Sequence, residues 1–185
     1  MKKIVIIRGK VTAGKSTTSH ALAKVLPGWV FIDIWKIKEM FEPLQLKNRK
    51  PMLEISKKAV VNIVKDTMKK LGNNIIIQES TTSFIKRKLG KYLKDHNYKV
   101  YTFFLDIDLK SAIQRDIQRE KPTMGFWKKK YTPEIWEKTK ATSNRGDIII
   151  HTKNKTVRQV VNIILKEIGE KRQKHPKAHW IRKAW

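Results

Sequence analysis

The sequence predicts an α/β domain built on a five-stranded parallel sheet with helices on both faces. Strand-like apolar runs alternate five times with segments whose apolar residues recur at helical spacing. These runs are continuous rather than alternating, as in parallel strands that are buried on both faces. The first run leads into the glycine-rich pattern G-x-x-x-x-G-K-S at residues 9–16. A chain of 185 residues is long enough to enclose one such core.

The expected elements follow one another with short connections. Strands are expected at residues 4–7, 29–33, 75–77, 100–105 and 147–151. Helices are expected at 15–26, 34–41, 52–71, 83–95 and 109–119, from Thr132 onward, and from Thr156 to 168. Such an order produces right-handed crossovers and one sheet, whose carboxyl edge binds ligands.

Local signals support the predicted helix ends. Pro27-Gly28 ends the first helix, and Gly72 suits the C-terminal cap of the third. Thr132 and Thr156 suit N-terminal caps, the first being followed by Pro133. The third helix is expected to have one apolar face. Six residues trace this face, and three more widen it: the six are Met52, Ile55, Ala59, Ile63, Thr67 and Leu71, and the three are Val60, Val64 and Met68.

Residues 9–16 match a loop that holds the phosphates of a nucleoside triphosphate. Backbone N–H groups that point inward cradle the phosphates, and glycines at 9 and 14 let the backbone turn and approach closely. Lys15 would reach the outer phosphates, and the hydroxyl of Ser16 would hold Mg²⁺. We therefore expect ATP and Mg²⁺ to bind, with contacts from Gly9, Lys10, Val11, Thr12, Ala13, Gly14, Lys15, Ser16 and Thr17.

Asp33 ends the second expected strand, next to the strand that carries the phosphate loop. A carboxylate there could accept the proton of a substrate hydroxyl that attacks the γ-phosphate. Because a helix follows, Asp33 could instead cap that helix. Lys36, one turn further on, could contact a phosphate of the substrate or be a surface lysine.

Three other acids follow expected strands. Glu79 comes after the third strand, where it could orient the metal, bind the substrate or cap the next helix. Asp106 and Asp108 flank the end of the fourth strand, and capping of the following helix is the expected use of both.

Arg115 and Arg119 are four residues apart on one helix and therefore share a face. They lead into a basic segment, so we expect a lid at about 119–133 whose arginines spread the charge of the transferring phosphate. The alternative is that they only neutralise the helix C-terminus. Arg145, just before the last strand, could also reach the nucleotide.

The composition is strongly basic, with 42 Lys and Arg against 16 Asp and Glu and a net charge of +26. Such an excess favours a polyanionic partner such as RNA or DNA, although lysine on a solvated face needs no ligand. The chain has no cysteine, which excludes disulfides and thiolate metal sites. No apolar run is long enough for a signal peptide or a membrane span, so a cytoplasmic location is expected.

Three features together resemble the P-loop kinases that phosphorylate polynucleotide 5′-hydroxyls and their relatives, including zeta-toxin-like and small-metabolite kinases. They are residues 9–16, the strand that ends in Asp33-Ile34-Trp35-Lys36, and Phe104-Leu105-Asp106 followed by Arg115 and Arg119. The resemblance covers about residues 1–168 and implies that Asp33 is the general base. It also implies that Lys36 binds the acceptor phosphate and that Arg115 and Arg119 are lid arginines.

The function expected from the sequence is ATP-dependent transfer of the γ-phosphate to a hydroxyl of a nucleic acid. The alternatives are a kinase of a nucleoside, nucleotide or other metabolite and, third, a nucleic-acid-stimulated ATPase. Residues 1–168 would form the kinase domain, and 169–185 a basic extension. Trp180 and Trp185 in that extension suit base stacking, although a frayed tail would look the same.

Overall fold

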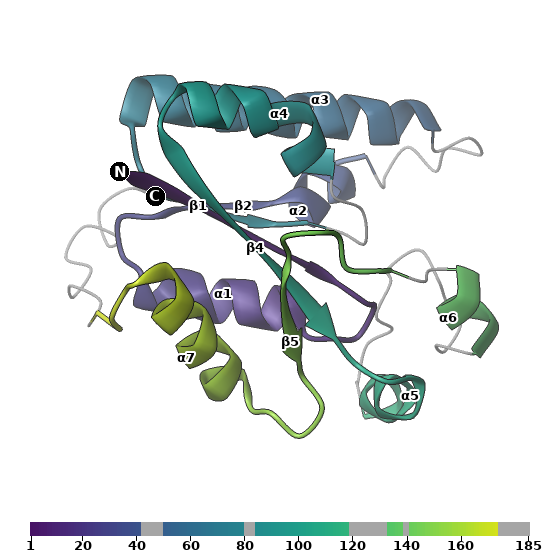
Figure 1. Ribbon diagram of the computed structural model, residues 1–185. Coiled ribbons are helices and arrows are strands. Elements are labelled where there is room, and N and C mark those ends of the chain that lie inside the picture. The colour runs from purple at the N-terminus through teal and green to yellow at the C-terminus, as the bar shows by residue number, and fades with distance from the viewer. Residues whose placement is uncertain (42–49, 80–83, 119–132, 139–140, 174–185) are drawn as a thin grey trace, which may run out of the picture.

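A parallel sheet with the strand order β2–β3–β1–β4–β5 forms the centre of the computed structural model (Figure 1). The strands are β1 (Lys2–Gly9), β2 (Val30–Asp33), β3 (Ile75–Gln78), β4 (Tyr98–Asp106) and β5 (Ile148–His151). The structure describes residues 1–41, 50–79, 84–118, 133–138 and 141–173. The predicted five-stranded parallel sheet is confirmed.

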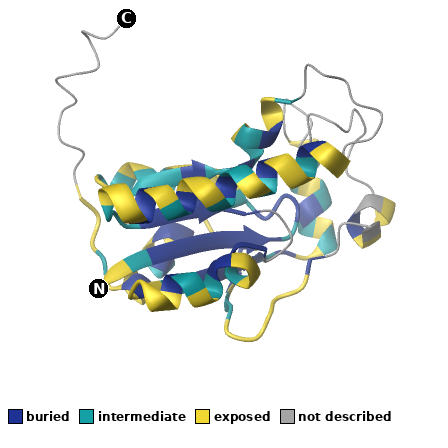
Figure 2. Cartoon of the chain, turned by 90° about the horizontal axis from the view of Figure 1, so that it is seen from above, coloured by how far each residue is buried: buried dark blue, intermediate teal, exposed yellow. Residues whose placement is uncertain are grey.

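Helices cover both faces of the sheet, as Figure 1 shows. One face carries α1 (Lys15–Val25) and α7 (Val157–Ile168), and the other carries α3 (Lys50–Asp66) and α4 (Phe84–Asp95). Successive residues of β1 point to opposite faces, so Val5 packs in the cluster beneath α1 and α7 whereas Ile6 packs in the cluster beneath α3 and α4. Figure 2 shows the strands buried between helices that are exposed on their outer sides. β1 is therefore held from both faces.

The remaining described elements are short and lie at the ends of strands. They are α2 (Ile34–Glu39), η2 (Thr67–Leu71), α5 (Leu109–Ile117) and α6 (Pro133–Lys138). The expected single helix over 52–71 is α3 followed by the wider turn η2, which Gly72 ends with a left-handed backbone at φ 60°. Asp108 caps α5, since its Oδ1 accepts a hydrogen bond from Ser111 N–H at 2.9 Å.

The predicted apolar face of α3 and η2 is confirmed in part: Met52, Val60, Val64, Thr67 and Met68 are buried. Met52, Ser56, Val60 and Val64 are buried, four residues apart in each case. Three residues of the predicted stripe are exposed instead: Ile55, Ile63 and Leu71. The buried stripe includes Ser56 because its hydroxyl donates to the Met52 carbonyl at 2.8 Å, so the polar group is satisfied within the helix.

The strand order corrects one expectation about Asp33. β3 lies between β2 and β1, so Asp33 is paired with Gln78 of β3 and is not next to the strand of the phosphate loop. Gln78 in turn is paired with Ile7 of β1. The carboxyl ends of the three strands still meet at one edge.

Residues 169–173 continue to contact the body of the protein beyond the predicted boundary at 168. Gln173 N–H donates to the Val25 carbonyl at 3.1 Å, and Glu170 pairs with Lys3 at 2.6 Å. The predicted tail beyond 173, with its two tryptophans, and the lid segment 119–132 lie outside the described residues. Within the described ranges, no helix combines the length and the apolar character that crossing a membrane requires.

Candidate active site

The loop between β1 and α1 has backbone geometry that only glycine allows at its first position. Gly9 has φ 143°, and a Cβ there would collide with the Leu105 carbonyl and lie 2.7 Å from Leu105 N. Gly14 has φ 90° and precedes α1 without any side-chain cap. The first amides of α1 are therefore not capped by the residue before the helix, and the loop fits a phosphate group.

The two lysines of the loop have different surroundings. Lys15 Nζ lies within the loop, where it donates to the carbonyls of Lys10 at 2.7 Å and Gly9 at 3.1 Å. Lys10 Nζ instead lies 2.7 Å from Asp106 Oδ1 and 4.9 Å from the centre of the Trp136 ring. The charge of Lys10 is thus directed to the end of β4, and Lys15 supplies the ammonium within the loop.

Ser16 has a buried partner that the sequence analysis did not single out. Gln78, at the end of β3, donates from Nε2 to Ser16 Oγ at 3.0 Å, while its buried Oε1 accepts no hydrogen bond from the described residues. Among the described residues, no group of three or more His, Asp or Glu side chains could hold a metal. The residues fit Mg²⁺ bound through the Ser16 hydroxyl and the phosphates of the nucleotide.

Glu79 follows Gln78 and is fully buried. Its Oε1 accepts a hydrogen bond from Ile85 N–H at 3.1 Å, in the first turn of α4, and its buried Oε2 has no hydrogen-bond partner in the parts of the chain that the structure describes. Burial raises the pKa of Glu79 to about 7, against the opposing hydrogen bonds of the α4 amides and the charges of Arg8 and Arg87. Of the three expected uses, the observed contacts are those of a helix cap.

Asp33 caps the helix that follows it and also has a carboxylate oxygen that faces another side chain. Its Oδ1 caps α2 by accepting from Trp35 N–H at 2.9 Å, and its Oδ2 faces His20 Nε2 at 3.9 Å. Burial raises the pKa of Asp33, and the Trp35 hydrogen bond and the charge of His20 offset this only in part. Trp35 N–H thus holds Oδ1, and the Lys36 amide also donates to the carboxylate, while Oδ2 faces His20.

Lys36 lies on the solvent side of α2. Its ammonium is 2.9 Å from Glu39 Oε2, and 69% of its side chain is exposed. The structure therefore does not bring Lys36 to the face of α2 that is buried.

A cavity of about 370 Å³ lies beside the phosphate loop, between α1, α5 and the turn that follows β5. Arg115 borders it, held by Thr152, whose carbonyl accepts from Nη2 at 2.6 Å. The other lining residues include loop and α1 residues predicted to bind the nucleotide and a set that the sequence analysis missed: Thr152, Lys155, Thr156 and Val157. Such a cavity next to the phosphate loop suits the base and ribose of a nucleotide.

The missed residues carry no motif of their own. The connection from β5 to α7 reads as an ordinary capped helix start, and Thr156 and Gln159 do form a capping box there. Only its position at the carboxyl end of a strand could have indicated a ligand site.

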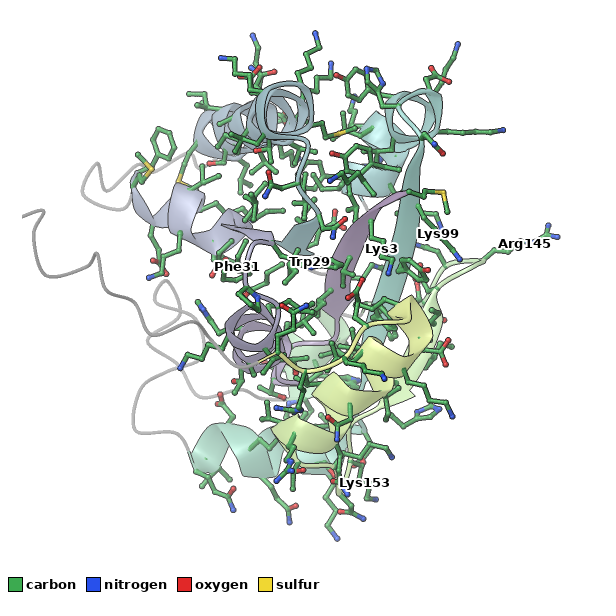
Figure 3. The ribbon with its side chains drawn as sticks, turned by 90° about the vertical axis from the view of Figure 1, so that its left-hand side faces the viewer. Lys3, Trp29, Phe31, Lys99, Arg145 and Lys153 are labelled. Carbon is green, nitrogen blue, oxygen red and sulfur yellow. The ribbon has the colours of Figure 1, made fainter. Side chains whose placement is uncertain are left out.

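One other predicted residue, Arg145, lies away from this cavity. Arg145 is on the exposed turn before β5, and its side chain points outward from the molecule (Figure 3). It is not among the residues that line the cavity, and its carbonyl accepts from Lys86 Nζ at 3.4 Å. Arg119 lies outside the described residues.

Asp106 also departs from its expected use as a helix cap. It joins Lys10 and His151, the latter at 3.0 Å. Burial alone would raise its pKa, but hydrogen bonds and charges from Lys10 and His151 outweigh burial and hold the pKa below its usual value.

A buried ion pair lies at the end of β1, directly before the phosphate loop. Arg8, just before Gly9, pairs with Asp147, and their side chains are 3% and 0% exposed. Arg8 also donates to the Thr142 carbonyl at 2.9 Å, and Asp147 accepts from Asn144 N–H at 2.7 Å. The pair therefore ties the phosphate-loop strand to the turn before β5.

A parallel sheet in this strand order, with a G-x-x-x-x-G-K-S loop between its central strand and a helix, is a P-loop fold. Solved structures with this fold, several of them kinases, resemble the chain over most of its length. The tunicamycin resistance protein of Deinococcus radiodurans superposes with a TM-score of 0.68 at 19% identity, covering 93% of this chain and 98% of that one.

A sugar kinase from Janibacter sp. gives a TM-score of 0.64 at 17% identity, with coverage of 91% and 95%. The APS kinase of Mycobacterium tuberculosis, solved with AMPPNP and APS, gives 0.61 at 11% identity, with coverage of 91% and 98%. No protein-family model and no curated protein sequence matches the chain. The TM-scores establish a shared fold, and at identities this low the likeness extends to the fold alone.

Proposed function

We propose that the protein is an ATP-dependent kinase that transfers the γ-phosphate to a hydroxyl of a small-molecule acceptor. One observation carries this proposal: a carboxylate with a raised pKa, Asp33, stands at the same edge of the sheet as the phosphate loop. Transfer to a hydroxyl requires a group that accepts the proton of that hydroxyl, and a carboxylate with a raised pKa is suited to this step.

The residues of this chain divide the work between binding and proton transfer. The cavity beside Arg115 takes the base and ribose, and the loop amides with Lys15 hold the phosphates. Asp33 Oδ2 takes the proton of the acceptor hydroxyl as its oxygen bonds to the γ-phosphorus, the bond from that phosphorus to the β,γ-bridging oxygen breaks, and ADP leaves. Magnesium, held by Ser16, would neutralise charge on the phosphates.

A small-molecule acceptor is supported by the proteins that share the fold. The sugar kinase and the APS kinase described above are both named for small acceptors. A nucleic-acid acceptor is the second candidate, favoured by the net charge of +26.

The substitution Asp33→Asn, which replaces one carboxylate oxygen by an amide nitrogen, tests the proposal. Asn caps helices as well as Asp does, so Asp33→Asn keeps the stability of the fold within about 1 kcal/mol. It removes the proton acceptor, so we expect transfer of labelled γ-phosphate to fall about 100-fold or more while ATP still binds.

Labelled ATP offered with separate metabolite, RNA and DNA fractions then identifies the acceptor class. Label in the metabolite fraction supports the main proposal, and label in RNA or DNA supports the second candidate. An Asp33→Asn protein that transfers phosphate at the normal rate would contradict both.

A further inference from the structure

Lys38 of α2 is a buried lysine on the same helix as the exposed Lys36. Only 7% of Lys38 is exposed, and its ammonium lies 4.3 Å from the centre of the Trp35 ring. Ile34, one turn earlier on the same face, is 1% exposed and belongs to the cluster beneath α3 and α4. The sequence gives no sign of the difference between Lys36 and Lys38, because both are simply lysines of a short helix.

The environment of Lys38 does not neutralise its charge. Lys36 is paired with Glu39, whereas in the described parts of the chain no carboxylate forms an ion pair with Lys38. The charged groups that face it are Lys57 of α3, which repels it, and Glu79, which attracts it from beyond ion-pair distance. Burial and the charge of Lys57 lower the pKa of Lys38. A buried ammonium without an anion is costly, and bound anionic ligands remove that cost.

The position of Lys38 relative to Asp33 matches the size of a metabolite. Asp33 is the residue before α2, and Lys38 is five residues further on. A helix rises about 1.5 Å per residue, so the two residues are roughly 7 to 8 Å apart along the helix axis. A molecule with a hydroxyl at one end and an anionic group at the other spans that interval.

We propose that Lys38 binds an anionic group, a phosphate or a carboxylate, of the acceptor whose hydroxyl reaches Asp33. This deepens the kinase function proposed above and rests on it. Lys38 suits this contact better than Lys36, because Lys38 is buried and forms no ion pair with a described carboxylate, whereas Lys36 is exposed and paired with Glu39.

The first experiment reads the site without any catalysis. Lysine acetylation by labelled acetic anhydride is followed by mass spectrometry of a chymotryptic digest, in which Lys36 and Lys38 are resolved by fragmentation. Inorganic phosphate and acetate are titrated separately, and Lys15 reports binding at the phosphate loop. We expect one of the two anions to slow acetylation of Lys38 in a saturable manner and to leave Lys36 unchanged. Reactivity of Lys38 that is independent of both anions would overturn the proposal, whether or not the protein is a kinase.

The second experiment measures transfer to pairs of acceptors that differ only by the anionic group, such as a nucleoside and its monophosphate or a polyol and its hydroxy acid. In Lys38→Met we expect KM for the anionic member to rise roughly 10- to 100-fold, the value of a charged hydrogen bond. The neutral member and kcat stay within twofold, and Lys38→Arg restores part of the loss. Lys58→Met, an exposed lysine of α3, is the control.

The outcomes separate the two proposals. A wild-type protein that transfers no phosphate refutes the kinase function, and the acetylation result then stands alone. A normal KM for anionic acceptors in Lys38→Met, or a rise in Lys36→Met instead, would overturn the assignment of Lys38 while leaving the kinase function intact.

Discussion

Gln78 Nε2 lies 3.0 Å from Ser16 Oγ, so the residue expected to hold Mg²⁺ is oriented by a buried amide from the neighbouring strand. Partners of this kind typically change metal affinity by 10- to 100-fold when they are removed, as an order of magnitude. In Gln78→Leu we therefore expect the Mg²⁺ concentration for half-maximal binding of a fluorescent ATP analogue to rise roughly 10-fold.

The matched variant is Gln78→Glu. A carboxylate at the same place adds a negative charge near the metal, so Mg²⁺ should bind at least as tightly as in the wild type. Equal Mg²⁺ dependence in Gln78→Leu and the wild type would show that Gln78 does not act on the metal.

Gly9 and Gly90 form a pair of glycines for which the same substitution has opposite expected effects. A Cβ at Gly9 meets backbone atoms of Leu105 with φ at 143°, whereas a Cβ at Gly90, inside α4, meets nothing within 4 Å. Gly9→Ala should lower the free energy of unfolding by about 3 kcal/mol or more. Gly90→Ala should raise it by about 0.5 to 1 kcal/mol, because alanine restricts the unfolded chain.

Urea denaturation followed by circular dichroism measures both. If Gly9→Ala is too unstable to purify, soluble expression alongside Gly90→Ala gives the direction. A Gly9→Ala protein as stable as the wild type would show that the loop does not pass as close to β4 as described.

The Arg8–Asp147 pair is expected to matter most when one partner is removed. Deleting Asp147 leaves the Arg8 guanidinium buried without its carboxylate, so Asp147→Ala should cost about 3 to 5 kcal/mol of unfolding free energy. The double variant Arg8→Met with Asp147→Leu removes both charges and should recover a large part of that loss. Urea midpoints of the two variants and the wild type measure this. A double variant as unstable as Asp147→Ala would contradict the prediction, because it would show that the loss does not come from an unpaired buried charge.

Glu79 gives a prediction for pH. Its pKa is raised from 4.5 to about 7 in the folded protein, so the folded state holds a proton that the unfolded state releases above pH 4.5. The stabilisation from the protonated carboxyl is therefore complete below pH 4.5 and is lost as the pH rises to about 7, up to about 3 kcal/mol.

Glu79→Gln does not titrate and keeps an oxygen that can accept from Ile85 N–H. The difference in unfolding free energy between wild type and Glu79→Gln should therefore change over pH 4.5 to 7 in favour of the variant. Parallel stability curves of the two proteins across this range would refute a raised pKa.

Arg115 is expected to act on the nucleoside rather than on the transferring phosphate. Its guanidinium is held at Thr152 and borders the cavity proposed for the base. Arg115→Ala should weaken ATP and ADP to the same extent, roughly tenfold, through loss of a cation–π contact. Calorimetric titrations with both nucleotides measure this, and Lys110→Ala on the same helix is the control. A loss confined to ATP would restore the interpretation of Arg115 as a clamp on the γ-phosphate.

The sequence by itself determined the sheet, the phosphate loop and the carboxyl edge at which Asp33 and Glu79 stand, because continuous apolar runs and a glycine motif are local signals. Tertiary structure decided that β3 lies between β2 and β1, and that α3 turns Ser56 rather than Ile55 to the sheet. It also decided that Lys38 rather than Lys36 is buried, and that the turn after β5 lines the cavity. These depend on which neighbour covers each residue, and periodicity along one helix or strand carries no information about that neighbour.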